Sequence, residues 1–116
     1  MENTTTEIDY AHFACVEMRV GTIITAVPFA KARHPAYQLT IDFGVQIGVK
    51  RSSAQITTHY TCTQLIDRQI VAVINFPVKQ IANFFSECLV LGAIQPDGSV
   101  ILLAPDSGTS NGDRIL

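Results

Sequence analysis

The chain has 116 residues, of which 47% are hydrophobic and only 16% are charged, with a formal net charge of −2 at pH 7. This length suits one domain with its own core, so residues 1–116 are expected to form a single domain. The composition excludes disorder, and its low charge suggests that part of the surface meets another subunit. No apolar stretch reaches the roughly 18 residues that span a bilayer, and the first seven residues lack the features of a signal peptide. We therefore expect a soluble, cytoplasmic protein without membrane insertion.

Metal ligands and nucleophiles are sparse and widely separated. The cysteines are Cys15, Cys62 and Cys88, and the histidines are His12, His34 and His59. This odd cysteine count without a Cys-x-x-Cys pair indicates neither a disulfide framework nor a zinc site, and no histidine pair has metal-ligand spacing. A triad built in space from Ser86 or Cys88 with a histidine is the remaining enzymatic alternative, but no nucleophile or cofactor motif supports it. We expect no catalytic residue, no metal and no cofactor.

The N-terminal part of the chain predicts a short helix followed by a bent strand. Asp9 can cap a helical turn over residues 10–15, its side chain accepting from the free amides at the helix start. Apolar residues then alternate with polar ones over residues 16–20, and beyond Gly21 the apolar side changes parity at Ile23. A glycine at this change predicts a bulge or bend that lets one long strand join both halves of a small barrel.

Two further strands and a helix follow in the middle of the chain. Apolar residues at every second position predict strands over Tyr37–Phe43 and Val45–Lys50, which form a hairpin about Gly44 with one wet face. A Thr-x-x-Gln capping box begins at Thr61 and predicts a short helix that ends at Ile66. One helix therefore interrupts an otherwise β chain.

The last third of the chain supplies the remaining strands. Segments Ile70–Phe76 and Cys88–Ile94 are nearly all apolar, which is typical of strands buried on both sides. A turn over residues 96–99 leads into residues 100–103, and the tail over residues 105–116 is expected to be docked because it ends in Ile-Leu. Three strands, a short helix and two strands is the order of the five-stranded OB-fold β-barrel. The predicted fold class is thus mainly all-β, with the short helix between strands 3 and 4 and short N- and C-terminal extensions.

The segment between the last two apolar strands is the best candidate for a working surface. Pro77 cannot donate a hydrogen bond to a sheet, so the preceding strand should stop at Phe76 and leave a mobile polar loop. The polar side chains of this loop are Asn75, Lys79, Gln80, Asn83, Ser86 and Glu87. As an alternative, Asn75, Ser86 and Glu87 satisfy backbone groups at turns and strand ends.

Two adjacent aromatic residues, Phe84 and Phe85, lie in the same segment. Neighbouring residues of an extended chain point in opposite directions, so at least one of the two belongs to the core. The other could stack on a base or receive an apolar peptide side chain. The sequence does not decide which of them is exposed.

Basic residues are grouped near predicted strand ends. Lys31 and Arg33 lie in the loop between strands 1 and 2, and Lys50, Arg51 and Ser52 lie in strand 3 near its end. Both groups could contact phosphate, whereas the alternative is that they are ordinary solvated loop charges.

Taken together, the segments resemble the CsaA family of export-related chaperones, which belongs to the tRNA-binding-domain group of OB-folds. The resemblance covers nearly the whole chain. The residues that carry it lie over 18–23, 35–37, 41–44, 50–57, 59–61, 73–77, 80–81, 84, 86–87, 102–103, 105–106 and 111–112. Two departures are Cys62, where similar sequences often start the helix with proline, and Val78-Lys79 in place of a common Pro-basic pair.

The resemblance implies a homodimer whose N- and C-terminal extensions help to build the interface, and binding without catalysis. It also implies that the clients are unexported precursor polypeptides, and that relatives bind the outside of folded tRNA. In that group the loop matching residues 75–86 lies at the binding surface. By this correspondence Asn75, Lys79 and Ser86 are the first binding candidates, with Lys50 and Arg51 as supporting cations.

Two functional hypotheses follow. The first is a dimeric chaperone for unfolded or export-destined polypeptides that also has tRNA-binding capacity. Its polypeptide-binding candidates are Asn75, Phe76, Lys79, Gln80, Phe84, Phe85, Ser86 and Glu87. The alternative is a structure-specific tRNA-binding protein without a primary chaperone role. The nucleic-acid-binding candidates are Lys31, Arg33, Lys50, Arg51, Ser52, Asn75, Lys79 and Ser86.

Overall fold

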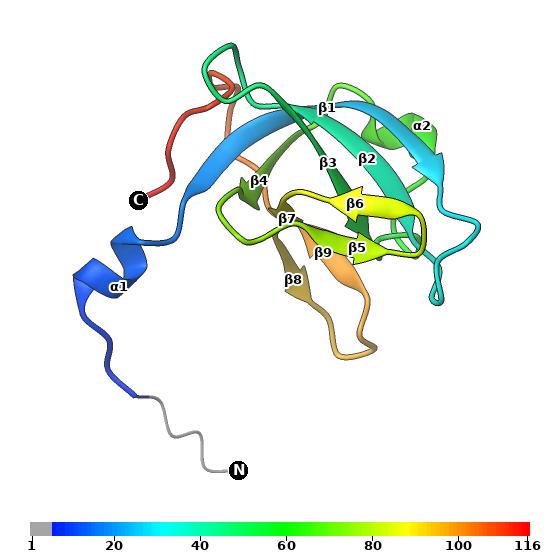
Figure 1. Ribbon diagram of the computed structural model, residues 1–116, viewed down its shortest axis with the longest axis horizontal. Coiled ribbons are helices and arrows are strands. Elements are labelled where there is room, and N and C mark those ends of the chain that lie inside the picture. The colour runs from blue at the N-terminus through cyan, green and yellow to red at the C-terminus, as the bar shows by residue number, and fades with distance from the viewer. Residues whose placement is uncertain (1–5) are drawn as a thin grey trace.

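The computed structural model describes residues 6–116, and the first five residues of the expected N-terminal extension lie outside this description. Its main feature is a five-stranded antiparallel sheet, in the order β3-β2-β1-β4-β7, that coils into a nearly closed barrel (Figure 1). Two short hairpins, β5–β6 and β8–β9, are attached to the barrel. The helices are α1 (Tyr10–Ala14) and α2 (Cys62–Leu65), and the strands are β1 (Met18–Pro28), β2 (Tyr37–Asp42), β3 (Val49–Ala54), β4 (Gln69–Val73), β5 (Lys79–Ile81), β6 (Phe84–Ser86), β7 (Leu89–Val90), β8 (Gly92–Ile94) and β9 (Val100–Leu102). The predicted barrel, with a helix between the third and fourth strands, is confirmed.

The long strand β1 holds the two halves of the barrel together. Its first half pairs with β4 and its second half with β2, and both pairings include Thr22. The expected bend is present, but the irregularity in the β1–β2 register lies between Ile23 and Thr25 and not at Gly21. Gly21 is required for a different reason, because a Cβ at this position would lie 2.6 Å from Cγ2 of Ile41. Strand β1 can therefore pass this close to Ile41 only if residue 21 has no side chain.

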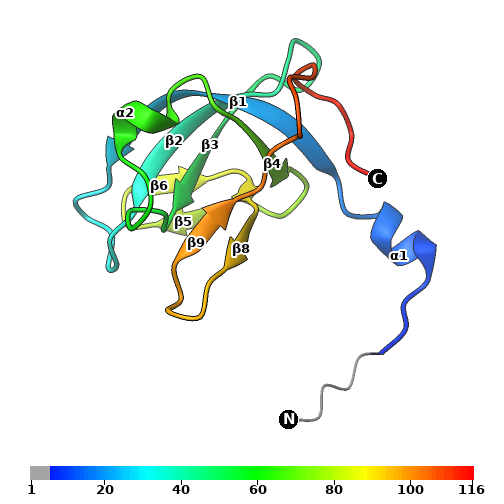
Figure 2. The ribbon, with the colours of Figure 1, turned by 180° about the vertical axis from the view of Figure 1, so that it is seen from behind.

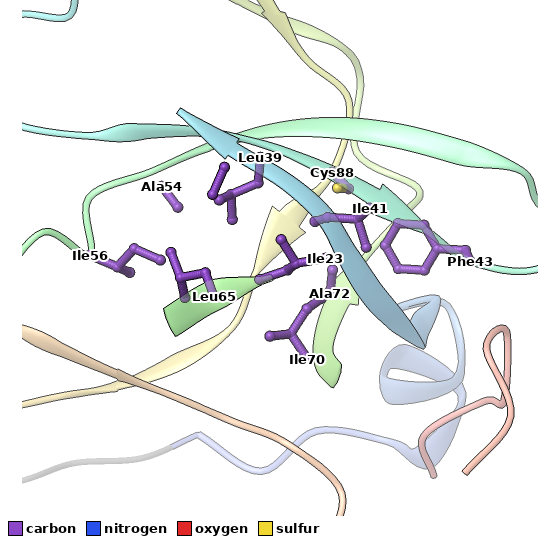
Figure 3. Packing of buried hydrophobic residues seen from close by; sticks show 11 residues of the cluster. Ile23, Leu39, Ile41, Phe43, Ala54, Ile56, Leu65, Ile70, Ala72 and Cys88 are labelled. Atoms are coloured by element: carbon purple, nitrogen blue, oxygen red, sulfur yellow. The ribbon is translucent and has the colours of Figure 1, made fainter. Parts of the chain in front are cut away.

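The core fills the inside of the barrel with branched and aromatic side chains (Figure 3). Ile23, Leu39 and Ile41 are completely buried, and they come from β1 and β2, whose apolar residues alternate as predicted. Helix α2 adds Leu65 to the same cluster. The predicted capping box is confirmed, since the Thr61 amide donates to the Gln64 side chain at 3.0 Å and the Gln64 amide donates to the Thr61 hydroxyl at 3.3 Å.

The third strand differs from the prediction. It was expected over Val45–Lys50, but β3 begins four residues later and residues 45–47 belong to the turn that precedes it. Gly44 and Gly48 both have positive φ in this turn, and the Gly48 amide donates to the Gly44 carbonyl at 2.7 Å. The inward positions of β3 carry small residues such as Ser52, whereas Val49 is exposed. The apolar alternation was therefore a misleading guide to the inward face of this strand.

The later strands are shorter and more exposed than predicted. β4 is buried on both sides as expected, but it ends at Val73 and not at Phe76. The segment expected over Cys88–Ile94 divides into β7 and β8, in which Leu89 is 48% exposed and Ile94 is 78% exposed. Their apolar side chains face solvent because β7 forms the edge of the sheet and β8 pairs only with β9. These two strands are therefore exposed to solvent on one face.

The N- and C-terminal extensions differ in how they contact the barrel. Helix α1 stands clear of the barrel in both ribbon views (Figures 1 and 2), and none of its residues is buried. The C-terminal tail is docked as predicted, since the Val20 amide donates to the Asp113 carbonyl at 2.9 Å and the Ile115 amide donates to the Met18 carbonyl at 2.9 Å. Within residues 6–116 no helix is long and apolar enough to cross a membrane.

The close approach at Gly21 gives a stability prediction. Gly21→Ala should lower the free energy of unfolding by about 1–3 kcal/mol, because the new methyl group would overlap Ile41 and the ring of Phe43 in the packed core. Urea denaturation followed by circular dichroism measures this change. Gly108→Ala is the matched control, since a Cβ at Gly108 meets no atom within 4 Å, and it should change stability by less than about 0.5 kcal/mol. Equal effects of the two substitutions on stability would contradict the close packing inferred at Gly21.

Candidate functional site

The segment between β4 and β7 forms an ordered hairpin, where the sequence predicted a mobile loop. β5 and β6 pair in the register Lys79↔Ser86, Gln80↔Phe85 and Ile81↔Phe84. The two-residue connection begins with Ala82, which adopts a φ of 54° that is unusual for a residue with a side chain. Because the side chains of a strand alternate, Lys79 and Ile81 lie on one face of the hairpin and Gln80 lies on the other.

The hairpin is fixed to β3 by three hydrogen bonds. The Glu87 amide donates to the Arg51 carbonyl at 2.7 Å, and the Arg51 amide donates back to Oε1 of Glu87 at 2.9 Å. The Ser53 amide donates to the Ser86 hydroxyl at 3.1 Å. These bonds close the gap between β3 and β7. Ser86 and Glu87 therefore satisfy backbone groups, which is the structural alternative that the sequence had left open.

A small second hydrophobic cluster joins the hairpin to the loop between β1 and β2. Phe84 is only 2% exposed, and its ring centroid lies 5.3 Å from that of Phe29. The guanidinium of Arg51 lies 4.3 Å from the centroid of the Phe84 ring, within the range of a cation–π interaction. Phe85 is 55% exposed. Phe84 is thus the core residue of the pair, and its prediction as a polypeptide-binding residue is corrected because it is buried.

Two adjoining hollows lie beside the β5–β6 hairpin. The first, of about 280 Å³, is lined by Phe76, Pro77, Lys79, Ser86, Cys88 and Leu89. The second, of about 290 Å³, is lined by Ser53, Ala54, Gln55, Ile56, Lys79, Ile81, Ser86, Cys88, Leu89, Val90 and Val100. Four residues are common to both, namely Lys79, Ser86, Cys88 and Leu89. We call the two hollows together the hairpin groove.

The floor of the hairpin groove carries no ionised thiol. Burial raises the pKa of Cys88 to about 12, so the thiol stays protonated at neutral pH. The Ser86 hydroxyl is engaged by the Ser53 amide, and the ring of His59 pairs with Ser99 at 2.7 Å. The Ser86 or Cys88 triad considered from the sequence is therefore not assembled with His59. Among residues 6–116 no group of three potential metal ligands gathers.

Three of the predicted cations lie beside the second cluster. Lys31, Arg33 and Arg51 are exposed, and Lys50 is partly buried. Lys31 and Arg33 flank Ala32, which packs on the cluster that contains Phe84, so the β1–β2 loop and Arg51 are brought to the same side of the hairpin. Ser52 is an exception, because it is completely buried and its hydroxyl donates to the Ser53 carbonyl. The predicted phosphate contact of Ser52 is corrected for this reason.

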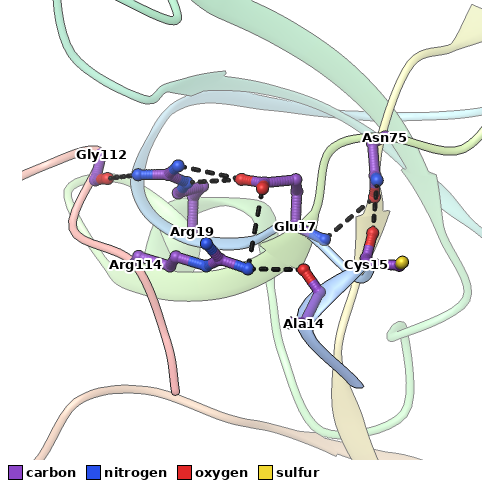
Figure 4. Close-up of polar contacts among 7 residues, drawn as sticks. All are labelled: Ala14, Cys15, Glu17, Arg19, Asn75, Gly112 and Arg114. Atoms are coloured by element: carbon purple, nitrogen blue, oxygen red, sulfur yellow. Dashed lines mark hydrogen bonds and ion pairs between the residues drawn. The ribbon is translucent and has the colours of Figure 1, made fainter. Parts of the chain in front are cut away.

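Asn75 joins the start of the hairpin segment to the N-terminal extension (Figure 4). Its side-chain amide donates to the Cys15 carbonyl at 2.7 Å, and its oxygen accepts from the Glu17 amide at 3.0 Å. Both polar ends of the side chain are therefore engaged inside the chain. Asn75 acts as a positioning residue for the segment that carries Phe76 and Pro77.

Charged side chains hold the two extensions together next to Asn75. Arg19 pairs with Glu17 at 2.9 Å and donates to the Gly112 carbonyl at 3.0 Å. Arg114 lies 3.7 Å from the other oxygen of Glu17 and donates to the Ala14 carbonyl at 2.7 Å. Glu17 therefore links residues near α1, the start of β1 and the C-terminal tail (Figure 4). The hydrogen bond from Arg19 is the main cause that lowers the pKa of Glu17.

Comparison with known proteins places this geometry in a family. Residues 18–114 match the family described as "Putative tRNA binding domain". The crystal structure of chaperone CsaA from Bacillus anthracis superposes with a TM-score of 0.91 and 46% identity, over 96% of this chain and 100% of that one. The CsaA chaperone protein from Picrophilus torridus gives a TM-score of 0.88 and 53% identity, over 95% and 100%. The chain belongs to the CsaA family.

The family assignment makes this chain a homologue of the CsaA chaperones, which are non-catalytic, with a tRNA-binding domain. A methionine–tRNA ligase from Chlorobium chlorochromatii is 27% identical over 110 residues, which are 93% of this chain but only 15% of the ligase. The CsaA-like chain thus spans about a sixth or less of the length of the first ligases that it matches.

Sequence reasoning missed several residues of the hairpin groove in this CsaA homologue. Among them is Leu89, which lines both hollows and is 48% exposed. Leu89 lies in a run of apolar residues, and such a run does not reveal that its strand forms a sheet edge.

The two adjacent phenylalanines give a stability prediction. Phe84→Ala should cost about 3–4 kcal/mol of unfolding free energy, because it leaves a cavity next to Phe29 and removes the contact with Arg51. Phe85→Ala is the matched control, and it should cost less than about 1 kcal/mol because the side chain is 55% exposed. Thermal and urea unfolding of the two variants compares them. A larger loss of unfolding free energy for Phe85→Ala than for Phe84→Ala would show that Phe85, and not Phe84, is the buried ring.

The Glu17 links give a pH prediction. Because folding lowers the pKa of Glu17 below its ordinary value of 4.5, these links contribute above that pH and are lost as the pH falls through the lower folded value. Hydrogen exchange should show the Ile115 amide losing protection at acidic pH, after correction for intrinsic rates, while the core Ile70 amide stays protected. Glu17→Gln should remove this pH step. A step that persists in Glu17→Gln would show that another group controls tail docking.

Proposed function

We propose that the chain acts as a chaperone that binds unfolded or export-destined polypeptides in the hairpin groove. The observation that carries this proposal is the largely apolar lining of two adjoining hollows on a protein of the CsaA family. Phe76 and Leu89 line the groove and are 56% and 48% exposed. Covering such surface with an apolar client segment removes it from water, which favours binding without catalysis.

The candidate residues take different roles in this proposal. Phe76 and Lys79 line the groove and contact the client, whereas Ser86 and Glu87 hold the hairpin against β3. Gln80 and Phe85 form a cross-strand pair on the opposite face of the hairpin from Lys79 and offer a second contact surface. Asn75 positions the segment and does not contact the client.

A homodimer is part of the proposal. Ile8 and Tyr10 beside and within α1 are each 67% exposed, and Leu116 at the end of the docked tail is 75% exposed. Apolar side chains on two linked extensions are suited to packing against a second copy. We also propose that residues 1–116 work as one tRNA-binding-type domain and that the protein acts in the cytoplasm.

Binding of tRNA is the second candidate function. The match to the tRNA-binding family and the position of Lys31, Arg33 and Arg51 on one side of the hairpin support it. Lys50 and Lys79 extend the same set of cations. In this model the cations contact phosphates, while Phe85 stacks on an exposed base.

The two functions differ in their response to salt and to substitution. Leu89→Ser should weaken suppression of aggregation of a chemically unfolded model protein about fivefold, since a partly buried leucine contact is worth about 1 kcal/mol. Light scattering during dilution from denaturant measures this, with Val45→Ser, at a fully exposed turn position, as the matched control. Client binding should change little between low and high salt. A Leu89→Ser variant that protects the client as well as Val45→Ser does would remove the groove from the proposal.

Binding of tRNA should instead fall steeply as salt rises, because phosphate contacts release counterions. A Lys31→Ala and Arg33→Ala double variant should lower tRNA affinity at low salt and leave protection of the model protein unchanged. Filter binding over a salt series measures this. Unchanged tRNA affinity would exclude the β1–β2 loop from the RNA-contacting surface.

A further inference from the structure

The hairpin groove has an unusual charge distribution. Of the residues within 6–116 that line either hollow, Lys79 alone carries a formal charge, and it belongs to both linings. The other lining side chains are apolar or neutral and polar, and the thiol of Cys88 stays protonated because its pKa is raised to about 12. A single ammonium group therefore accompanies an otherwise uncharged surface.

No carboxylate within residues 6–116 forms an ion pair with Lys79. The two ion pairs found there both involve Glu17, which pairs with Arg19 and Arg114. Glu87 is the nearest acidic residue along the hairpin, but its carboxylate accepts from the Arg51 amide at 2.9 Å.

A client segment that covers the apolar walls would exclude water from around the ammonium group. Removing a charge from water is costly unless the ligand brings an opposite charge, and a like charge on the ligand adds to the cost. Alternate side chains of an extended peptide lie on one face about 7 Å apart, so apolar side chains can enter the two hollows while the side chain between them on the same face lies near Lys79, which lines both hollows. The chemistry of the groove thus discriminates on the charge of that middle side chain.

We propose that Lys79 is a specificity-determining residue that selects extended client segments in which an acidic side chain stands between two apolar ones on the same face of the segment. This inference rests on the proposed function, since it assumes that the groove takes polypeptide. Exclusion of segments with lysine or arginine at the same place is as important as attraction of glutamate, because specificity is a difference between two affinities.

Three peptides of the form Leu-Ser-x-Ser-Leu within an otherwise identical neutral extended sequence test the proposal, with x as Glu, Gln or Lys. Fluorescence anisotropy with the full chain at low and physiological salt gives the affinities. The wild-type protein should bind the Glu peptide about three- to tenfold more tightly than the Lys peptide, with the Gln peptide between them, as suits a partly solvated ion pair. Lys79→Gln should remove the difference, and Lys79→Glu should reverse its order.

Arg68→Gln is the matched control, since Arg68 is exposed after α2 and lines neither hollow. It should leave the peptide order unchanged, and circular dichroism checks that each variant is folded. Equal affinities of the three peptides for the wild type would overturn the charge selection and leave the proposed function standing. Failure of all three peptides, together with no protection of an unfolded protein, would overturn both. If Lys79→Gln weakens only tRNA binding, Lys79 belongs to an RNA-contacting surface and the inference is wrong.

Discussion

The structure depends on the closure of the barrel between β3 and the end of the β5–β6 hairpin. That closure is made by the main chain, through the 2.7 Å bond from the Glu87 amide to the Arg51 carbonyl, and by the Glu87 carboxylate, which accepts from the Arg51 amide at 2.9 Å. Strand β7 alone is too short to provide it, because it contains only two residues. The pair Arg51 and Glu87 thus fixes both the end of the core and the wall of the hairpin groove. The guanidinium of Arg51 extends this link to Phe84 and, through Phe29, to the loop between β1 and β2.

The sequence predicted those elements whose side chains follow a strong period. Leu39, Ile41 and the capping box at Thr61 all lie where the pattern placed them. β3 was misplaced because its inward positions need small residues such as Ser52, which carry no hydrophobic signal. The burial of the Cys88–Ile94 segment was overestimated because the sequence does not say which strand forms the edge of a sheet. Composition alone cannot separate a sheet edge from a central strand.

For the candidate site, the sequence pointed to the segment between β4 and β7, and the structure shows that several of its polar side chains make contacts within the chain. Asn75, Ser86 and Glu87 are polar residues of a loop-like stretch, and their side chains are engaged by the backbone of distant segments. These partners are 33 to 60 residues away, so no local pattern could reveal them. Leu89 was missed for the opposite reason, since an exposed leucine looks like a core residue in a sequence. Only the contacts made in the folded chain distinguish the residues that anchor the site from those that are exposed on its surface.

Phe84 points into the protein and Phe85 points outward, and this arrangement also limits how the segment can change in length. Each strand of the hairpin alternates between its two faces, and the connection at Ala82 contains two residues. Insertion of a single residue between Phe85 and Glu87, with the closure at Glu87 kept, would shift the register and exchange the faces of the β6 residues that precede it. Phe85 would then replace Phe84 against Phe29, and the buried ring would be delivered to solvent. Lineages of this fold should therefore accommodate length variation at the hairpin tip, outside the paired positions, and keep the spacing between Phe84 and Glu87 constant.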